Sequence, residues 1–148
     1  MIEKAIGKAY RTAEKKQWNK IYWAIDLHDT CLKSTYGKNN YEFLGPVVIE
    51  ALRLICSRPE NVLIIWSAVF ADEEPLIVEF FAKEGIRIDF FNHNPVIQNT
   101  ATGNFDTKFY FNVLVDDKAG FDWTQDWQKI IDLYEYAGTS FRHQVSSK

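Results

Sequence analysis

Cysteine is scarce in this chain of 148 residues, and the two cysteines lie far apart in the sequence. Cys31 and Cys56 form no CxxC pair, so we expect reduced thiols rather than a zinc site or a disulfide framework. Long apolar runs are also absent, and residues 1–20 lack the apolar core of a signal peptide. We therefore expect a cytoplasmic protein with no membrane partner.

A large excess of charge of one sign is missing too, because 17 basic and 20 acidic residues give a formal net charge of −3. The chain as a whole is therefore not a polyanion binder by bulk charge. The charge is unevenly distributed, since residues 1–20 carry six basic and two acidic residues, a net charge of +4, which leaves −7 for the remainder. We interpret this basic segment as the solvated face of a helix, and nucleic acid stays open as a partner.

Apolar residues are plentiful, at 47% of the chain with 16% aromatic, and they supply a sizeable core for one domain. We predict a single domain over 1–148. It comprises a basic N-terminal helix at 1–19, a core at 20–137 and a flexible tail at 138–148. The sequence leaves the oligomeric state open.

Segments with helical and strand-like patterns alternate along the chain. Strands are predicted at 21–25, 62–66, 86–91 and 109–115, and helices at 3–17, from Pro46 to the Arg58-Pro59 pair, at 72–83 and at 123–136. This alternation predicts an α/β fold with a Rossmann-like parallel sheet of about five strands flanked by helices. The polar segments 27–45 and 92–107 are too short to form a cap domain.

Polar side chains collect at or beside three of the predicted strand ends: Asp26, His28, Thr30, Ser67, Lys108, Asp116 and Asp117. In parallel α/β sheets, ligands bind outside the carboxyl ends of the strands. Carboxylates on neighbouring strands suit Mg²⁺, while a hydroxyl and a lysine suit the oxygens of a phosphate. An aspartate can also act as a nucleophile. The set therefore predicts phosphoryl chemistry with Mg²⁺ as cofactor.

The order of these motifs resembles that of the haloacid dehalogenase-like (HAD) hydrolases. "AIDLHDT", "LIIWS", a lysine and "VLVDD" follow the order of the four motifs of that family over about residues 20–120. "FFNHNP" and "TKFYFNVLVDD" are most similar to small members that nearly lack a cap. The resemblance implies a HAD-like fold with a minimal cap and a Mg²⁺-dependent phosphatase activity.

The resemblance also implies roles in catalysis. Asp26 matches the nucleophile and Ser67 the hydroxyl that binds phosphate. Lys108 is our choice for the lysine that binds phosphate, with Lys83 and Lys118 as alternatives.

The metal ligands follow from the same comparison of motifs. Asp26 and Asp116 match the carboxylates that bind Mg²⁺, and Asp117 would act beside them or through water. The residue at position 28 would offer its backbone carbonyl whatever its side chain, which makes His28 the fourth ligand.

His28 departs from the family pattern, which normally has an acid/base aspartate at this position, and Asp29 replaces a glycine or small residue. In one interpretation His28 takes over proton transfer, because its ordinary pKa suits neutral pH. In the other, acid–base help is lost, which would slow turnover roughly 10²–10⁴-fold. Asp29 is a poor substitute, since neighbouring side chains at a strand end point apart.

Three hypotheses follow from these residues. The leading one is a phosphohydrolase that forms an aspartyl-phosphate on Asp26, acting on a phosphorylated small molecule or macromolecular end. The second is a catalytically impaired HAD-like protein that binds a phosphorylated ligand or a partner. The third, a receiver-like phosphoacceptor domain, is disfavoured because the acidic pair, Asp116 and Asp117, follows the last strand rather than the first.

Overall fold

The computed structural model describes residues 1–35 and 38–146, with side chains through residue 136. In chain order the elements are α1 (Ile2–Lys16), β1 (Ile21–Asp26), α2 (Pro46–Cys56), β2 (Asn61–Trp66), the 3-10 turn η1 (Ala71–Glu73), α3 (Glu74–Ala82), β3 (Phe90–Phe91), β4 (Val113–Val115), the 3-10 turn η2 (Asp117–Ala119) and α4 (Asp126–Ser146). Strands and helices alternate, so the predicted α/β fold class is confirmed.

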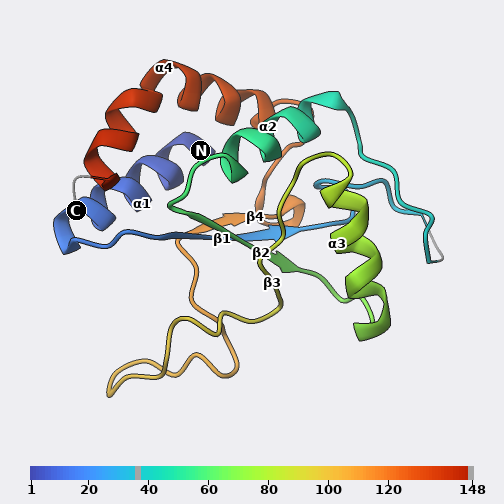
Figure 1. Cartoon of the computed structure of the whole chain (residues 1–148), viewed down its shortest axis with the longest axis horizontal. Helices are drawn as coiled ribbons and strands as arrows, with labels where there is room; N and C mark the ends of the chain where they lie inside the picture. The colour runs from blue at the N-terminus through green and yellow to red at the C-terminus, as the bar shows by residue number, and fades with distance from the viewer. Residues whose placement is uncertain (36–37, 147–148) are drawn as a thin grey trace.

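The sheet has the strand order β3-β2-β1-β4, and each pair of neighbours is parallel (Figure 1). Asp26 at the end of β1 pairs in register with Trp66 at the end of β2, and Ile25 pairs with Val115 of β4. The Rossmann-like parallel sheet is therefore confirmed, but the predicted number of about five strands is wrong, since the described residues form four.

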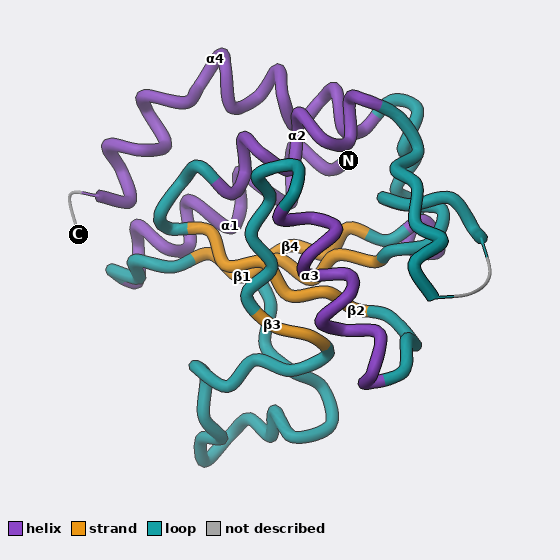
Figure 2. Tube along the Cα trace, turned by 45° about the vertical axis from the view of Figure 1, so that its right-hand side comes forward, coloured by secondary structure: helices purple, strands orange, loops and turns teal. Residues whose placement is uncertain are grey.

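The helices and the long loop before β4 lie on different sides of the sheet. Figure 1 shows α1, α2 and α4 above the sheet and the loop between β3 and β4 below it, and Figure 2 shows the same arrangement from another angle. The larger core cluster joins one face of the sheet, including Trp23 and Ile25, to buried residues of all four helices. The smaller cluster, on the other face, combines Tyr22 and Ala24 with aromatic residues of the loop such as Phe109.

Two strands are shorter than predicted because side chains replace backbone groups in the ladder. The predicted strand 86–91 is paired only at Phe90–Phe91, where the carboxylate of Asp89 accepts from the backbone N–H of Leu63 at 2.8 Å. The predicted strand 109–115 is paired only at Val113–Val115, and the side chain of Asn112 accepts from the N–H of Tyr22 at 2.8 Å.

The helices differ from the predictions mainly at their ends. The last helix starts at Asp126 rather than 123 and continues to Ser146, so its predicted end at 136 is wrong. The segment predicted as a flexible tail therefore has a helical backbone as far as Ser146, and residues 147–148 lie outside the described residues. Within the described chain, no helix has both the length and the apolar character needed to cross a bilayer.

The segment after β1 forms a short flap. Leu32 and Phe43 make an antiparallel bridge, and Phe43 stacks on Phe80 of α3 with ring centroids 5.0 Å apart. Residues 36–37 of this segment lie outside the described residues. The described part of the segment is held against α3 by this aromatic contact.

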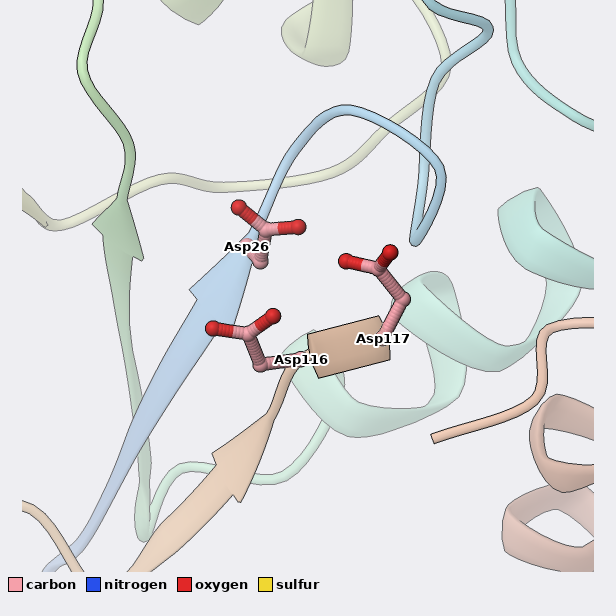
Figure 3. A group of neighbouring side chains, drawn as sticks. All are labelled: Asp26, Asp116 and Asp117. Atoms are coloured by element: carbon pink, nitrogen blue, oxygen red, sulfur yellow. The ribbon is translucent and has the colours of Figure 1, made fainter. Parts of the chain in front are cut away.

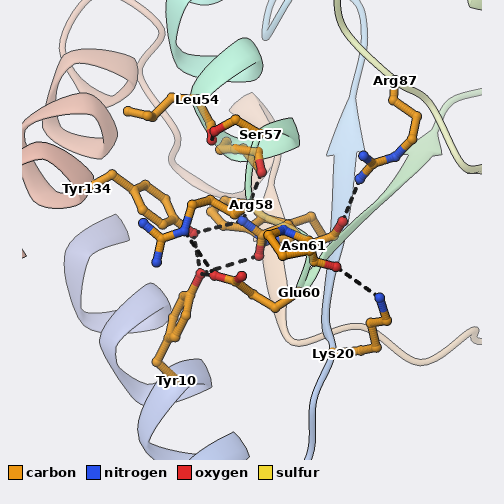
Figure 4. A network of polar contacts seen from close by, with 12 residues as sticks. Tyr10, Lys20, Leu54, Ser57, Arg58, Glu60, Asn61, Arg87 and Tyr134 are labelled. Carbon is orange, nitrogen blue, oxygen red and sulfur yellow. Dashed lines mark hydrogen bonds and ion pairs between the residues drawn. The ribbon is translucent and has the colours of Figure 1, made fainter. Parts of the chain in front are cut away.

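A buried polar network joins α1, α4 and the start of β2 (Figure 4). Tyr10 donates to Glu60 at 2.6 Å, and the Asn61 amide donates to the Tyr134 hydroxyl at 3.1 Å. Arg58 forms a buried ion pair with Glu60 at 3.2 Å. This network lies at the amino-terminal end of β2, whereas the predicted site lies at the carboxyl ends of the strands.

The two cysteines, Cys31 and Cys56, are both buried and unpaired. Burial raises the pKa of each thiol.

Candidate functional site

Three carboxylates meet at the carboxyl ends of β1 and β4. Asp26 is the last residue of β1, Asp116 follows β4, and Asp117 opens η2. One oxygen of each carboxylate lies within 4.8 Å of the others, and Figure 3 shows the three groups facing a common space. Because β1 and β4 are parallel neighbours, their ends lie side by side. The structure thus brings together the three aspartates that the sequence predicted as metal ligands.

The turn after β1 places a buried hydroxyl among these carboxylates. The carbonyl of Leu27 accepts from the N–H groups of Cys31 and Leu32, both at 2.8 Å, and this folds the chain back on itself. The Thr30 hydroxyl then lies 3.0 Å from the Asp26 carboxylate and 3.4 Å from that of Asp117. It also accepts from the N–H of Asp117 at 3.1 Å, which ties the loop after β1 to the loop after β4.

Asp29 adopts the left-handed conformation in this turn, with φ at 63°. Glycine adopts this region without strain, and aspartate is among the few other residues that tolerate it. The backbone of this turn therefore accommodates an aspartate at position 29.

The loop after β4 is fixed by the backbone of η2. The Asp116 carboxylate accepts from the N–H of Lys118 at 3.0 Å, and the Asp116 carbonyl accepts from the N–H groups of Ala119 and Phe121.

The three carboxylates repel one another, and this repulsion contributes to a raised pKa at Asp26. The pKa of Asp26 is raised to about 7, first by burial and then by the charges of Asp116 and Asp117, while the hydrogen bond from Thr30 acts to lower it. Among the described residues, no side-chain nitrogen of lysine or arginine lies within 4.0 Å of the three carboxylates. A cluster of oxygen donors that lacks a cationic side chain fits a hard divalent cation such as Mg²⁺.

His28 and Ser67 line one hollow of about 330 Å³ at the same edge of the sheet, together with Tyr41, Phe70 and Glu73. Ser67 follows β2, and Asn92 fixes it from both sides. The Asn92 side chain accepts from the N–H of Ser67 at 2.8 Å and donates to its carbonyl at 2.6 Å. The imidazole of His28 is not part of the carboxylate group. The ligand role of its backbone carbonyl stays a prediction.

Lys108 lies on the face of the sheet that the loop covers. It lines a hollow of about 390 Å³ with Ala24, Trp66 and Leu114, and its ammonium is 5.8 Å from the centre of the Phe111 ring. Ala24 and Leu114 precede Asp26 and Asp116 by two residues, so the hollow lies on the face toward which those carboxylates point. The phosphate-binding role of Lys108 stays a prediction.

The two alternative lysines are placed differently. Lys83, in the turn after α3, forms an ion pair with Glu79 on the surface. Lys118 contributes its backbone N–H to Asp116.

Three residues support the site although the sequence analysis assigned them no role in it. Thr30 belongs to the first motif, Asn92 belongs to "FFNHNP", and Trp127 donates its indole N–H to the Thr30 carbonyl at 2.8 Å. Thr30 and Asn92 could have been identified from the sequence, because each lies within a quoted motif. The helical spacing of Trp127 indicated only a core residue.

Comparisons with known proteins define the fold but no family. No family model matches the chain, and no curated protein matches it. A solved structure of a conserved protein from Bacteroides thetaiotaomicron is similar, with a TM-score of 0.59 and 19% sequence identity over 80% of this chain and 92% of that one. At this identity the similarity shows the Rossmann-like α/β fold alone.

Proposed function

We propose that this protein is a Mg²⁺-dependent phosphohydrolase that forms an aspartyl-phosphate on Asp26. The observation that carries the proposal is the convergence of Asp26, Asp116 and Asp117 at adjacent strand ends, each with an oxygen within 4.8 Å of the others. The order of the four HAD-like motifs adds support, because it assigns a nucleophile, a hydroxyl and a lysine around the same carboxylates.

The metal would be held by Asp26 and Asp116, with Asp117 beside them and the backbone carbonyl of His28 as a further ligand. When bound, Mg²⁺ would offset the repulsion between these carboxylates and an incoming phosphate.

Catalysis would proceed in two steps on Asp26. Its ionised carboxylate attacks phosphorus, the bond to the leaving oxygen breaks, and the imidazolium of His28 gives that oxygen a proton. Neutral His28 then takes a proton from water, which attacks the aspartyl-phosphate, releases inorganic phosphate and restores Asp26. The Ser67 hydroxyl and the Lys108 ammonium would hold the phosphate oxygens.

The second candidate is a protein that binds a phosphorylated ligand or a partner without turnover. It is favoured by the histidine at position 28 and by the position of that imidazole outside the carboxylate group. Loss of general acid–base help would slow turnover roughly 10²–10⁴-fold.

The deciding experiment is hydrolysis of an aryl phosphate with and without Mg²⁺, from about pH 5 to pH 8. We expect activity that requires the metal and falls to background in Asp26→Asn. The matched control is Asp132→Asn on the exposed side of α4, where the carboxylate contacts only Gln128 in the described part of the chain, and it should keep full activity. Activity that survives in Asp26→Asn would contradict the proposal.

The variant His28→Asp separates the two candidates. A further loss of activity or a changed pH profile would make His28 a working acid/base. An inactive natural protein that gains activity in His28→Asp would favour the binder. Calorimetric titration with Mg²⁺ provides a readout that is independent of turnover, and the affinity should fall in Asp116→Asn.

A further inference from the structure

Four cations form a stripe along the exposed face of α1. Lys4, Lys8, Arg11 and Lys15 follow one another at spacings of four, three and four residues, which places them on one side of a helix. All four are exposed, and no described carboxylate lies within 4.0 Å of them. We call this set the basic stripe. It is a local feature, because the chain outside residues 1–20 carries a net charge of −7.

The opposite face of α1 is already used by the fold. Ile2, Ile6, Ala9, Tyr10 and Ala13 are buried in the main core. A helix that lies in a membrane surface needs a free apolar face to enter the lipid, and α1 has none to offer. The basic stripe can therefore bind only through its charges, which favours a polyanion in water over a bilayer.

The start of α1, where the stripe begins, lies beside Asp116, one of the three carboxylates. The start of α1, at Met1, Ile2 and Ala5, lines a hollow of about 340 Å³ together with Asp116 and Gly120. The stripe begins at Lys4 and extends about 16 Å to Lys15 along the helix axis. A nucleic acid strand with stacked bases presents a phosphate roughly every 3.4 Å, so this length matches about five phosphates.

Aromatic side chains lie at the other end of the stripe. Trp18 follows α1, and the ammonium of Lys16 lies 5.1 Å from the centre of its ring. Trp18, Phe105 and Tyr110 line a hollow of about 420 Å³ with Lys20. Flat rings beside cations are suited to stacking with nucleobases, which inorganic polyphosphates and lipid headgroups lack.

We propose that the basic stripe and the hollow at Trp18 bind a nucleic acid whose terminal phosphate is the ester hydrolysed at Asp26. This inference rests on the proposed function. In the net reaction, water adds to phosphorus, the bond from phosphorus to the terminal oxygen of the nucleic acid breaks, and the products are a terminal hydroxyl and inorganic phosphate.

Binding is tested apart from turnover, by fluorescence anisotropy of a labelled single-stranded 12-mer without a terminal phosphate, in EDTA. The test variant is Lys8→Gln/Arg11→Gln. The control is Arg53→Gln/Lys129→Gln, which removes the same charge from α2 and α4, where each of these side chains pairs with a carboxylate. We expect the test variant alone to weaken binding, by on the order of tenfold to a hundredfold at about 50 mM salt. The slope of log Kd against log salt should fall in magnitude by about 1.4, which corresponds to two lost phosphate contacts.

Several outcomes of the binding test overturn the inference. These are no binding at the lowest salt, an equal loss in both double variants, or stripe-dependent binding to phosphatidylserine vesicles without binding of the 12-mer. The last result would assign the stripe to a membrane surface.

The substrate is tested with 12-mers that carry a 5′ or a 3′ phosphate, beside an aryl phosphate. Lys8→Gln/Arg11→Gln should raise KM for one or both oligonucleotides about tenfold and leave kcat/KM for the aryl phosphate unchanged. If the aryl phosphate is hydrolysed and neither oligonucleotide is, the inference fails and the proposed function stands. If the 12-mer binds and no phosphoester is hydrolysed, the proposed function fails, and the substrate assignment fails with it.

Discussion

The Asp26 carboxyl is half-buried among other carboxyls, and this gives the metal-free protein a defined pH dependence. Its pKa is about 7 in the folded chain and close to 3.9 when unfolded. A raised pKa means that the fold favours the protonated form, so the stabilisation is complete below about pH 4 and is lost as the pH rises through 7.

We expect the unfolding free energy of the natural protein, relative to Asp26→Asn, to fall by about 1–2 kcal/mol from pH 4 to pH 8, after allowance for solvent screening. Urea denaturation in EDTA at several pH values measures this difference. Addition of Mg²⁺ at pH 8 should raise the stability of the natural protein by mass action. Parallel pH profiles for the two proteins would show that Asp26 does not titrate in this way.

The sequence predicted which residues meet at one end of the sheet where a short apolar run ends in a polar side chain. Asp26, Ser67 and Asp116 follow such runs, and the parallel register brings the ends of β1, β2 and β4 to one edge. Lys108 has no such signal, because its position depends on how Phe109 and Phe111 pack against the open face of the sheet.

At the scale of elements, α4 supports the site from a distance. Trp127 is fully buried, and its indole N–H donates to the Thr30 carbonyl, 97 residues away in the sequence. No spacing rule predicts such a contact, since tertiary packing alone creates it. The same limit explains why the ends of β3 and β4 were missed, where the side chains of Asp89 and Asn112 take over hydrogen bonds of the ladder.

Trp127→Phe should therefore weaken both the fold and the site. The variant leaves the buried Thr30 carbonyl without its donor, which we expect to destabilise the protein by about 1–3 kcal/mol. A shift of Thr30 relative to Asp26 should lower kcat for an aryl phosphate, by up to about 10²-fold. Urea denaturation and steady-state kinetics measure the two effects.

The matched control is Trp123→Phe. Trp123 packs near Gly45, and its indole nitrogen makes no hydrogen bond to the described residues. Equal losses in both variants would show that the effect comes from ring volume rather than from the hydrogen bond to Thr30.

At the scale of the whole molecule, the two faces of the sheet are built unequally. One face packs against a core shared by all four helices, and the other is covered by the loop between β3 and β4. The backbone of this loop bonds locally, for example from the N–H of Phe105 to the Asn99 side chain. Such segments open at lower free energy than central strands.

Hydrogen exchange should reveal this inequality. We expect amides in residues 93–108 to exchange on the order of a thousandfold faster than those of β1 and β2. Mass spectrometry of peptic fragments resolves these segments. Protection of the loop equal to that of β1 would mean that its aromatic residues hold it as firmly as the helices hold the opposite face.

The burial of both thiols makes the natural chain a convenient background for site-specific labelling. Cys31 is 0% exposed and Cys56 is 9% exposed, and both have a raised pKa, so maleimide reagents should react slowly with either one. A cysteine introduced at the exposed Phe70, beside the hollow that contains His28 and Ser67, would then carry a fluorophore or spin label alone. Ligand arrival at the carboxylates could be followed spectroscopically without first removing a native residue.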